Sequence, residues 1–146
     1  MFVVEILRTK GPEVISIAPD QTVEEVVQLF RNNNIGFVVV SSASGECLGT
    51  LSERDCCNAV ADHGTKAPMM QVAEIMNSNV ATCSVDDGLP LVMAIMTKLR
   101  RRHVLVMNGD TLVGVVSIGD VVKHQLDESL RNEQHLHDYI CGNGYY

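Results

Sequence analysis

The chain has 146 residues, of which 46% are hydrophobic and 20% charged, so it can fold around a packed core and does not have the composition of a disordered protein. Its formal net charge of −7 argues against nucleic-acid binding, which needs lysines and arginines clustered over a broad face. No apolar run approaches the roughly 18 to 20 residues of a membrane span, and Glu5 interrupts an N-terminus without a cleavage signature. We therefore expect a soluble, cytoplasmic protein that binds neither nucleic acid nor membrane.

The first half of the chain predicts a helix, a strand, a second helix, a hairpin and a third helix. Thr22 and Glu25 stand three residues apart, which is the spacing of a capping box, so a helix should begin near Thr22. Its apolar residues recur with helical spacing. The other expected elements are a helix over residues 3–7, a strand over 14–17, and hairpin strands over 37–40 and 48–51.

The second half repeats this order. The repeated helix follows Asp86-Asp87 and carries Pro90 in its first turn, where a missing N–H costs nothing. Asn108-Gly109 is a strong signal for a tight hairpin turn. The other expected elements are a helix over residues 72–76, a strand over 80–83, and hairpin strands over 104–107 and 111–116. Gaps between the repeats fall in turn-like segments, as duplication of a folded unit predicts.

This pattern predicts an α+β fold made of two tandem β-α-β-β-α units. We expect repeat 1 over residues 1–63, a linker over 64–71, repeat 2 over 72–127 and a C-terminal helical extension over 128–146. A three-stranded sheet with helices on one side leaves its other face uncovered, so the units should pack together about a pseudo-two-fold axis. Two related clefts would then lie between them.

One polar motif, Gly-x-x-Ser-x-x-Asp, occurs once in each repeat where a strand is expected to run into a helix. The Ser-x-x-Asp part is also how helices cap themselves, so the motif can be purely structural. Its duplication favours a recognition site, because a helix N-terminus attracts phosphate and a carboxylate can accept hydrogen bonds from both hydroxyls of a ribose. The residues concerned are Gly49, Ser52 and Asp55, and Gly114, Ser117 and Asp120.

On these motifs the chain resembles a tandem pair of CBS domains, also called a Bateman module. The resemblance runs from Val3 to about Asp127, and the segment Val4-Glu5-Ile6-Leu7-Arg8-Thr9-Lys10-Gly11 is similar to the start of small stand-alone members. It implies a regulatory module that is not an enzyme and has no catalytic cofactor. It also implies an adenosine ligand in the interlobe clefts: AMP, ADP, ATP, NAD(H) or S-adenosylmethionine.

The resemblance also implies roles for individual residues. Asp55 and Asp120 would hold ribose hydroxyls, while Ser52 and Ser117 would face phosphate or ribose. The remaining expected nucleotide-binding residues are Arg54 and Lys10 for phosphates, Ile35, Gly36 and Phe37 with Arg101, Arg102 and His103 around the adenine, and Ser16 and Thr82 at the pocket wall. For Lys10, which stands beside Gly11, a solvated loop residue is the favoured interpretation and a phosphate contact the alternative.

The two clefts should differ. Arg101 stands where the family usually has an apolar adenine contact, and Gly119 is the counterpart of Arg54. An arginine at position 101 could stack on a base, meet a phosphate or simply suit the end of a helix dipole. We therefore expect the cleft of Ser52 and Asp55 to be the better site.

The last part of the chain predicts a long helix over residues 121–140 with an apolar stripe that one chain leaves uncovered. The stripe consists of Val122, Leu126, Leu130, Leu136 and Tyr139. Packing against a second copy would cover it, so we expect a homodimer, and a regulated partner protein that reads its state. A structural dimerisation or partner-interaction module without nucleotide is the main competing hypothesis.

Cysteine and histidine positions bear on disulfide formation, metal binding and redox chemistry. The five cysteines are an odd number without a Cys-x-x-Cys pair, which predicts reduced thiols rather than disulfides or a zinc site. His135 and His137 lie on different faces of a helix, so we expect no metal. A thiol-redox regulator that uses Cys56 or Cys57 is a weaker hypothesis.

Overall fold

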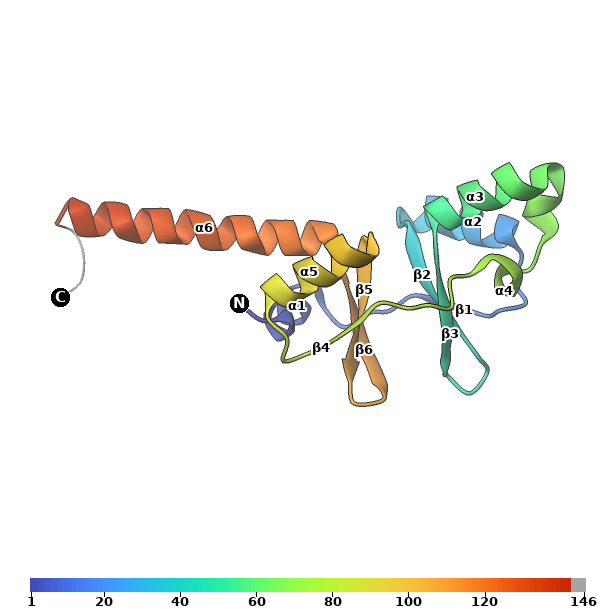
Figure 1. Cartoon of the computed structure of the whole chain (residues 1–146), viewed down its shortest axis with the longest axis horizontal. Coiled ribbons are helices and arrows are strands. Elements are labelled where there is room, and N and C mark those ends of the chain that lie inside the picture. Colours follow the sequence, from blue (N-terminus) through green and yellow to red (C-terminus); the bar gives the residue numbers. More distant parts are fainter. Residues whose placement is uncertain (143–146) are drawn as a thin grey trace.

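The computed structural model describes residues 1–142, which form two lobes, each with a three-stranded sheet (Figure 1). The sheet orders are β1-β2-β3 and β4-β5-β6, with a parallel first pair and an antiparallel hairpin in each. The elements of the first half are α1 (Val3–Lys10), β1 (Ser16–Ile17), α2 (Val23–Asn33), β2 (Phe37–Ser41), β3 (Cys47–Ser52) and α3 (Glu53–His63). Those that follow are η1 (Gly64–Met69), α4 (Val72–Ile75), β4 (Thr82–Ser84), α5 (Leu89–Leu99), β5 (His103–Asn108), β6 (Thr111–Ser117) and α6 (Ile118–Ile140).

The helices α2 and α5 begin as their sequences predict. The Thr22 hydroxyl accepts a hydrogen bond from the Glu25 N–H at 3.3 Å, which confirms the capped start of α2. α5 begins after Gly88, which offers no capping side chain, and has Pro90 in its first turn. Both helices end on a left-handed residue with φ of 52°, Asn34 in one repeat and Arg100 in the other.

Several expected boundaries were wrong in detail. The first strand of each repeat is shorter and starts later than expected. β1 and β4 are edge strands, and each pairs with one neighbouring strand only. α1 continues to Lys10, and the Gly64–Met69 part of the linker forms a 3₁₀ helix, for which no conformation had been predicted. The C-terminal helix is confirmed to Ile140, while residues 143–146 of the expected extension lie outside the described residues.

The first helix of each repeat packs in the lobe of the other repeat. Val3 and Ile6 of α1 are fully buried in the core that contains the second sheet, and the Val3 N–H donates to the Asp87 carbonyl at 2.9 Å. Val72 of α4 is buried in the core of the first sheet, and its N–H donates to the Gln21 carbonyl at 2.8 Å. Figure 1 shows α1 beside the second sheet and α4 beside the first. Each lobe is therefore completed by a segment from the other half of the chain.

α6 extends well beyond the second lobe (Figure 1). Its 23 residues correspond to about 35 Å of helix at 1.5 Å per residue. Among residues 1–142, no helix has both the length and the apolar composition that crossing a membrane requires.

Gly49 and Gly114 occupy matching positions in β3 and β6, but a methyl group would meet different neighbours at each. A Cβ at Gly49 would lie 2.7 Å from the backbone carbonyl oxygen of Asn77, whereas one at Gly114 would lie 2.6 Å from the end of the Leu7 side chain. A side-chain tip can rotate away and a hydrogen-bonded backbone cannot. We expect Gly49→Ala to lower the free energy of unfolding by about 1–3 kcal/mol and Gly114→Ala to lower it less, as measured by urea denaturation. Equal losses would contradict this account of the close approach.

Candidate functional site

Each Ser-x-x-Asp motif lies where a strand ends and a helix begins, a place called a corner below, and both corners fold as capped helix starts. The Asp55 N–H donates to the Ser52 hydroxyl at 3.3 Å, and the Ser52 N–H donates to Asp55 Oδ2 at 2.8 Å. In the second corner the corresponding distances are 3.2 Å for Asp120 to Ser117 and 2.9 Å for the reverse. The capping interpretation is therefore confirmed for both corners. Any further role depends on what else reaches the carboxylates.

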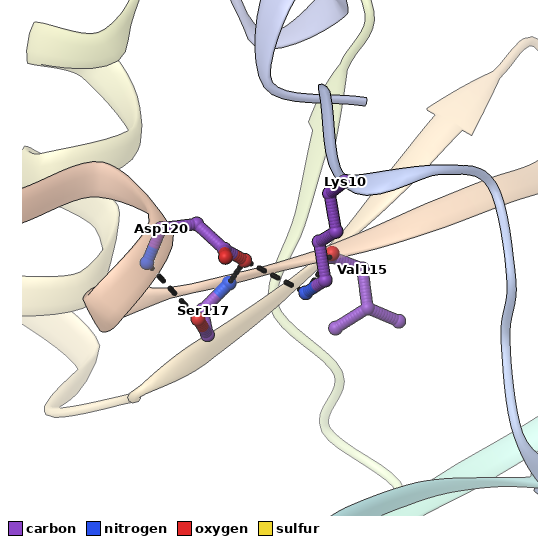
Figure 2. Close-up of polar contacts among 4 residues, drawn as sticks. All are labelled: Lys10, Val115, Ser117 and Asp120. Carbon is purple, nitrogen blue, oxygen red and sulfur yellow. Dashed lines mark hydrogen bonds and ion pairs between the residues drawn. The ribbon is translucent and has the colours of Figure 1, made fainter. Parts of the chain in front are cut away.

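In the second corner a lysine from the N-terminal helix reaches the carboxylate (Figure 2). Lys10 Nζ lies 2.7 Å from Asp120 Oδ2 and also donates to the Val115 carbonyl at 3.0 Å. Burial raises the pKa of Asp120, but the hydrogen bonds from Lys10 and Ser117 outweigh it, so the pKa lies below its usual value. This carboxylate is thus already satisfied by the protein itself.

The first corner instead opens into a cavity of about 550 Å³ between the lobes. This volume is in the range of about 300–1,000 Å³ that small-molecule sites occupy. Within residues 1–142, Asp55 has no salt bridge, and Asn79, which follows α4, is among the residues that line this cavity. The lining residues are Gly36, Phe37, Thr50, Ser52, Glu53, Arg54, Asp55, Cys57, Asn79, Val80, Ala81, Arg100, Arg101, Arg102, His103 and Leu105.

Two stacked rings connect the lobes at this cavity. Phe37 and His103 are the first residues of β2 and β5, and their ring centroids lie 4.2 Å apart with an interplanar angle of 10°. Burial lowers the pKa of His103 to about 4, with further lowering by Lys10 and Arg102 against an opposing contribution from Asp120. At neutral pH the imidazole is therefore uncharged, and an aromatic pair without charge joins the two sheets.

The structure brings together many of the residues that the sequence predicted for a nucleotide site. Those that line the cavity are Gly36, Phe37, Ser52, Arg54, Asp55, Arg101, Arg102 and His103. Lys10, Ser117 and Asp120 form the separate second corner. Ser16 and Thr82 are exposed at the starts of β1 and β4, and Ile35 packs against the first core, so none of these three lines the cavity. Their roles toward a ligand stay predictions.

Sequence reasoning missed several lining residues. Asn79 lies in the segment where the two repeats differ by three residues, so the repeat pattern did not point to it. Arg100 belonged to a basic run whose next two members were predicted. Thr50, Glu53, Cys57, Val80, Ala81 and Leu105 gave no comparable signal, because only the packing of the lobes brings them to the cavity.

The lowered pKa of His103 makes the free energy of unfolding depend on pH in the acid range. The unfolded chain binds a proton near the ordinary His pKa of 6.5, while the folded chain binds it only near 4, so the free energy of unfolding falls as the pH drops through this window. His103→Phe, which copies the residue at Phe37, should lose less stability than the wild type between pH 7 and pH 4.5 in urea denaturation. His135→Gln on α6 is the exposed-histidine control and should behave like the wild type. An unchanged pH dependence in His103→Phe would contradict the assignment.

Comparison with known proteins gives a consistent result. The sequence model of the CBS domain matches residues 3–62 and 72–127. A mitochondrial CBS domain-containing protein of Arabidopsis thaliana, CBSX3, is 29% identical in an alignment that covers 94% of this chain and 71% of the relative. The crystal structure of a CBS-domain containing protein from Agrobacterium tumefaciens is 39% identical with a TM-score of 0.83, over 85% of this chain and 92% of that one.

A more distant structure shares the fold and contains ligands. It is the CBS domain pair of protein MJ0100, described in complex with 5′-methylthioadenosine and S-adenosyl-L-methionine. That pair is 22% identical to this chain, with a TM-score of 0.76 over 88% of this chain and 98% of the other.

Proposed function

This chain belongs to the CBS-domain family, and we propose that it is a non-catalytic regulatory module that binds an adenine nucleotide in the cleft between its lobes. The observation that carries the proposal is the 550 Å³ cavity, which joins the Ser52 and Asp55 corner of one repeat to the Arg100–His103 segment of the other. Another CBS pair is described with two adenosine compounds bound, which supports a ligand of this type.

Asp55 is the residue we assign to the ribose. Its carboxylate lines the cavity and has no salt-bridge partner within residues 1–142. Oδ2 already accepts from the N–H and the hydroxyl of Ser52, so Oδ1 is the oxygen that would accept from the ribose hydroxyls. In the second corner a ribose would have to displace Lys10 from Asp120. The first cleft should therefore fill first, with Lys10 free to meet a phosphate only if that ion pair opens.

Regulation follows if the ligand favours one arrangement of the lobes or of two copies. Only a ligand with different affinities for two states can shift their populations, and a partner protein can then read the change. A cavity walled by both repeats gives the ligand contacts that depend on how the lobes sit together.

The buried thiols do not favour a redox function, which leaves the exposed Cys57 as the cysteine on which that hypothesis depends. All five cysteines are free in the structure. Burial, with contributions from Asp55 and neighbouring groups, raises the pKa of Cys56 to about 11, so this thiol stays protonated and unreactive at neutral pH. Burial and Asp87 likewise raise the pKa of Cys83 to about 11. We propose a reducing compartment, with the cytoplasm as the location.

Asp55→Asn tests the proposed ribose contact. Removing the charge should weaken binding of ATP and AMP at least about tenfold, which is what loss of a charge-assisted hydrogen bond worth about 1.5–3 kcal/mol predicts. The loss in folding stability should be only about 1 kcal/mol or less, because an asparagine side chain can still accept the hydrogen bond from the Ser52 N–H. Isothermal titration calorimetry on protein freed of carried-over ligand measures the first effect, and urea denaturation measures the second.

Two variants serve as comparisons. Asp62→Asn removes the same charge from an exposed position at the other end of α3 and should bind like the wild type. Asp120→Asn reports on the second corner. Wild-type binding by Asp55→Asn would leave the corner as a helix cap only, and absence of heat with AMP, ATP, NADH and S-adenosylmethionine would favour a purely structural module.

We also propose that a second copy of this chain covers the apolar row on α6. Val122, Leu126 and Leu130 are 59%, 56% and 54% exposed at a spacing of four residues, on a helix that projects beyond its own lobe (Figure 1). Leaving such a row in water is unfavourable, and homodimers bury such surfaces.

Charges placed on this row should separate the dimer. We expect Leu126→Glu with Leu130→Glu to run as a monomer in light scattering after size exclusion, while the wild type runs as a dimer. Gln125→Glu with Ser129→Glu adds the same two charges at neighbouring exposed positions of the helix and should remain a dimer. A monomeric wild type would refute this part of the proposal.

A further inference from the structure

Positive charge is concentrated at the open cavity of an otherwise acidic protein. The chain has 11 lysines and arginines and a net charge of −7. Four of its arginines, which are Arg54, Arg100, Arg101 and Arg102, line this one cavity. The carboxylates among the lining residues are those of Glu53 and Asp55, so the wall carries more positive than negative charge.

These arginines come from both sides of the cleft. Arg54 is the second residue of α3, next to the Ser52 and Asp55 corner, where the helix N-terminus already favours an anion. Arg100, Arg101 and Arg102 connect α5 to β5 in the other lobe. An anion in the cavity would therefore meet cationic groups from both repeats.

The fold itself does not require arginine at any of these positions, because the other repeat builds the same backbone without them. Asn34 adopts the same left-handed conformation as Arg100, with φ of 52° in both. The Glu53 N–H donates to the Gly36 carbonyl at 3.0 Å, just as the Ile118 N–H donates to the Arg102 carbonyl at 2.8 Å. Gly119 holds the place of Arg54 at the start of α6. The two repeats thus show that the same backbone forms with and without arginine at these positions.

Within the part of the chain that the structure describes, none of the four arginines has a carboxylate partner; the salt bridge found there joins Lys10 and Asp120. Guanidinium groups do not deprotonate at physiological pH, so their mutual repulsion is not relieved by loss of a proton. Their planar forks match phosphate oxygens in paired hydrogen bonds.

From this arrangement we propose that the open cleft selects adenine nucleotides that carry a pyrophosphate or triphosphate group, over adenosine and over S-adenosylmethionine; this inference rests on the proposed function. Several phosphate charges can neutralise arginines from both lobes together. Adenosine leaves all of them without a counter-ion, and the positive sulfonium of S-adenosylmethionine adds repulsion.

The first test compares ligands by isothermal titration calorimetry on ligand-free wild-type protein. We expect affinity to rise at least about tenfold from adenosine to ADP and ATP, and S-adenosylmethionine to bind no better than adenosine. Inorganic tripolyphosphate is the probe for phosphate alone and should bind more weakly than ATP. The affinity for ATP should fall as salt rises from 50 mM to 300 mM, and that for adenosine should change little.

The second test removes single arginines. Arg54→Gln and Arg101→Gln should each lower the ratio of ATP affinity to adenosine affinity by about tenfold. Arg131→Gln, an exposed position on α6, is the charge-matched control and should keep the wild-type ratio. Without ligand, Arg101→Gln should unfold at the same temperature as the wild type or higher, since it relieves repulsion; a residue needed only for structure would unfold earlier.

The outcomes separate the two proposals. If adenosine, ATP and S-adenosylmethionine bind equally well, or if the arginine variants keep the wild-type ratio, phosphate selection is wrong while the nucleotide-binding function stands. If tripolyphosphate binds as tightly as ATP, the cleft is an anion site, and selection of an adenine nucleotide is wrong. If no adenine compound binds, the proposed function itself fails.

Discussion

The exchange of first helices between the lobes is the constraint on which the rest of the structure depends. Val3 and Ile6 of α1 are buried in the second lobe, and Val72 of α4 is buried in the first. Separating the lobes would expose these apolar side chains to water, at about 0.8 kcal/mol for each buried CH₂ group. The exchange therefore sets which faces of the two sheets meet, and with it which residues wall the cavity.

The same exchange explains why the two corners differ. α1 packs in the second lobe and carries Lys10 to the carboxylate of Asp120, while the chain after α4 packs in the first lobe and carries Asn79 to the cavity of Asp55. An ammonium satisfies one carboxylate, and a neutral amide leaves the other without a counter-ion. The two copies of the duplicated unit differ in sequence and in length after their first helices, and this difference gives one corner an ion pair and leaves the other facing the cavity.

The sequence predicted well those features that depend on neighbours along the chain. The capped start of α2 at Thr22 and the long C-terminal helix follow from local patterns, and the structure confirms them. The tight hairpin turn is also present, but its two loop residues are Gly109 and Asp110, because Asn108 pairs with Thr111. The Lys10–Asp120 ion pair and the Phe37–His103 stack could not be predicted, because each joins residues that only the packing of the lobes brings together. Ser16 and Thr82 were expected at a pocket wall from their place in the repeat; the cavity found here does not include them, and their roles toward a ligand stay predictions.

Charge and stacking act on the cleft in opposite directions when no ligand is bound. The neutral rings of Phe37 and His103 draw the lobes together, while the arginines that line the cavity repel one another across it. An anion bound among the arginines removes the repulsion and leaves the stacking, so it favours the lobe arrangement seen here over any more open one. Because the walls come from both repeats, the proposed ligand would contact both lobes, and its binding would therefore depend on how they are arranged, which is the change that the proposed partner would sense.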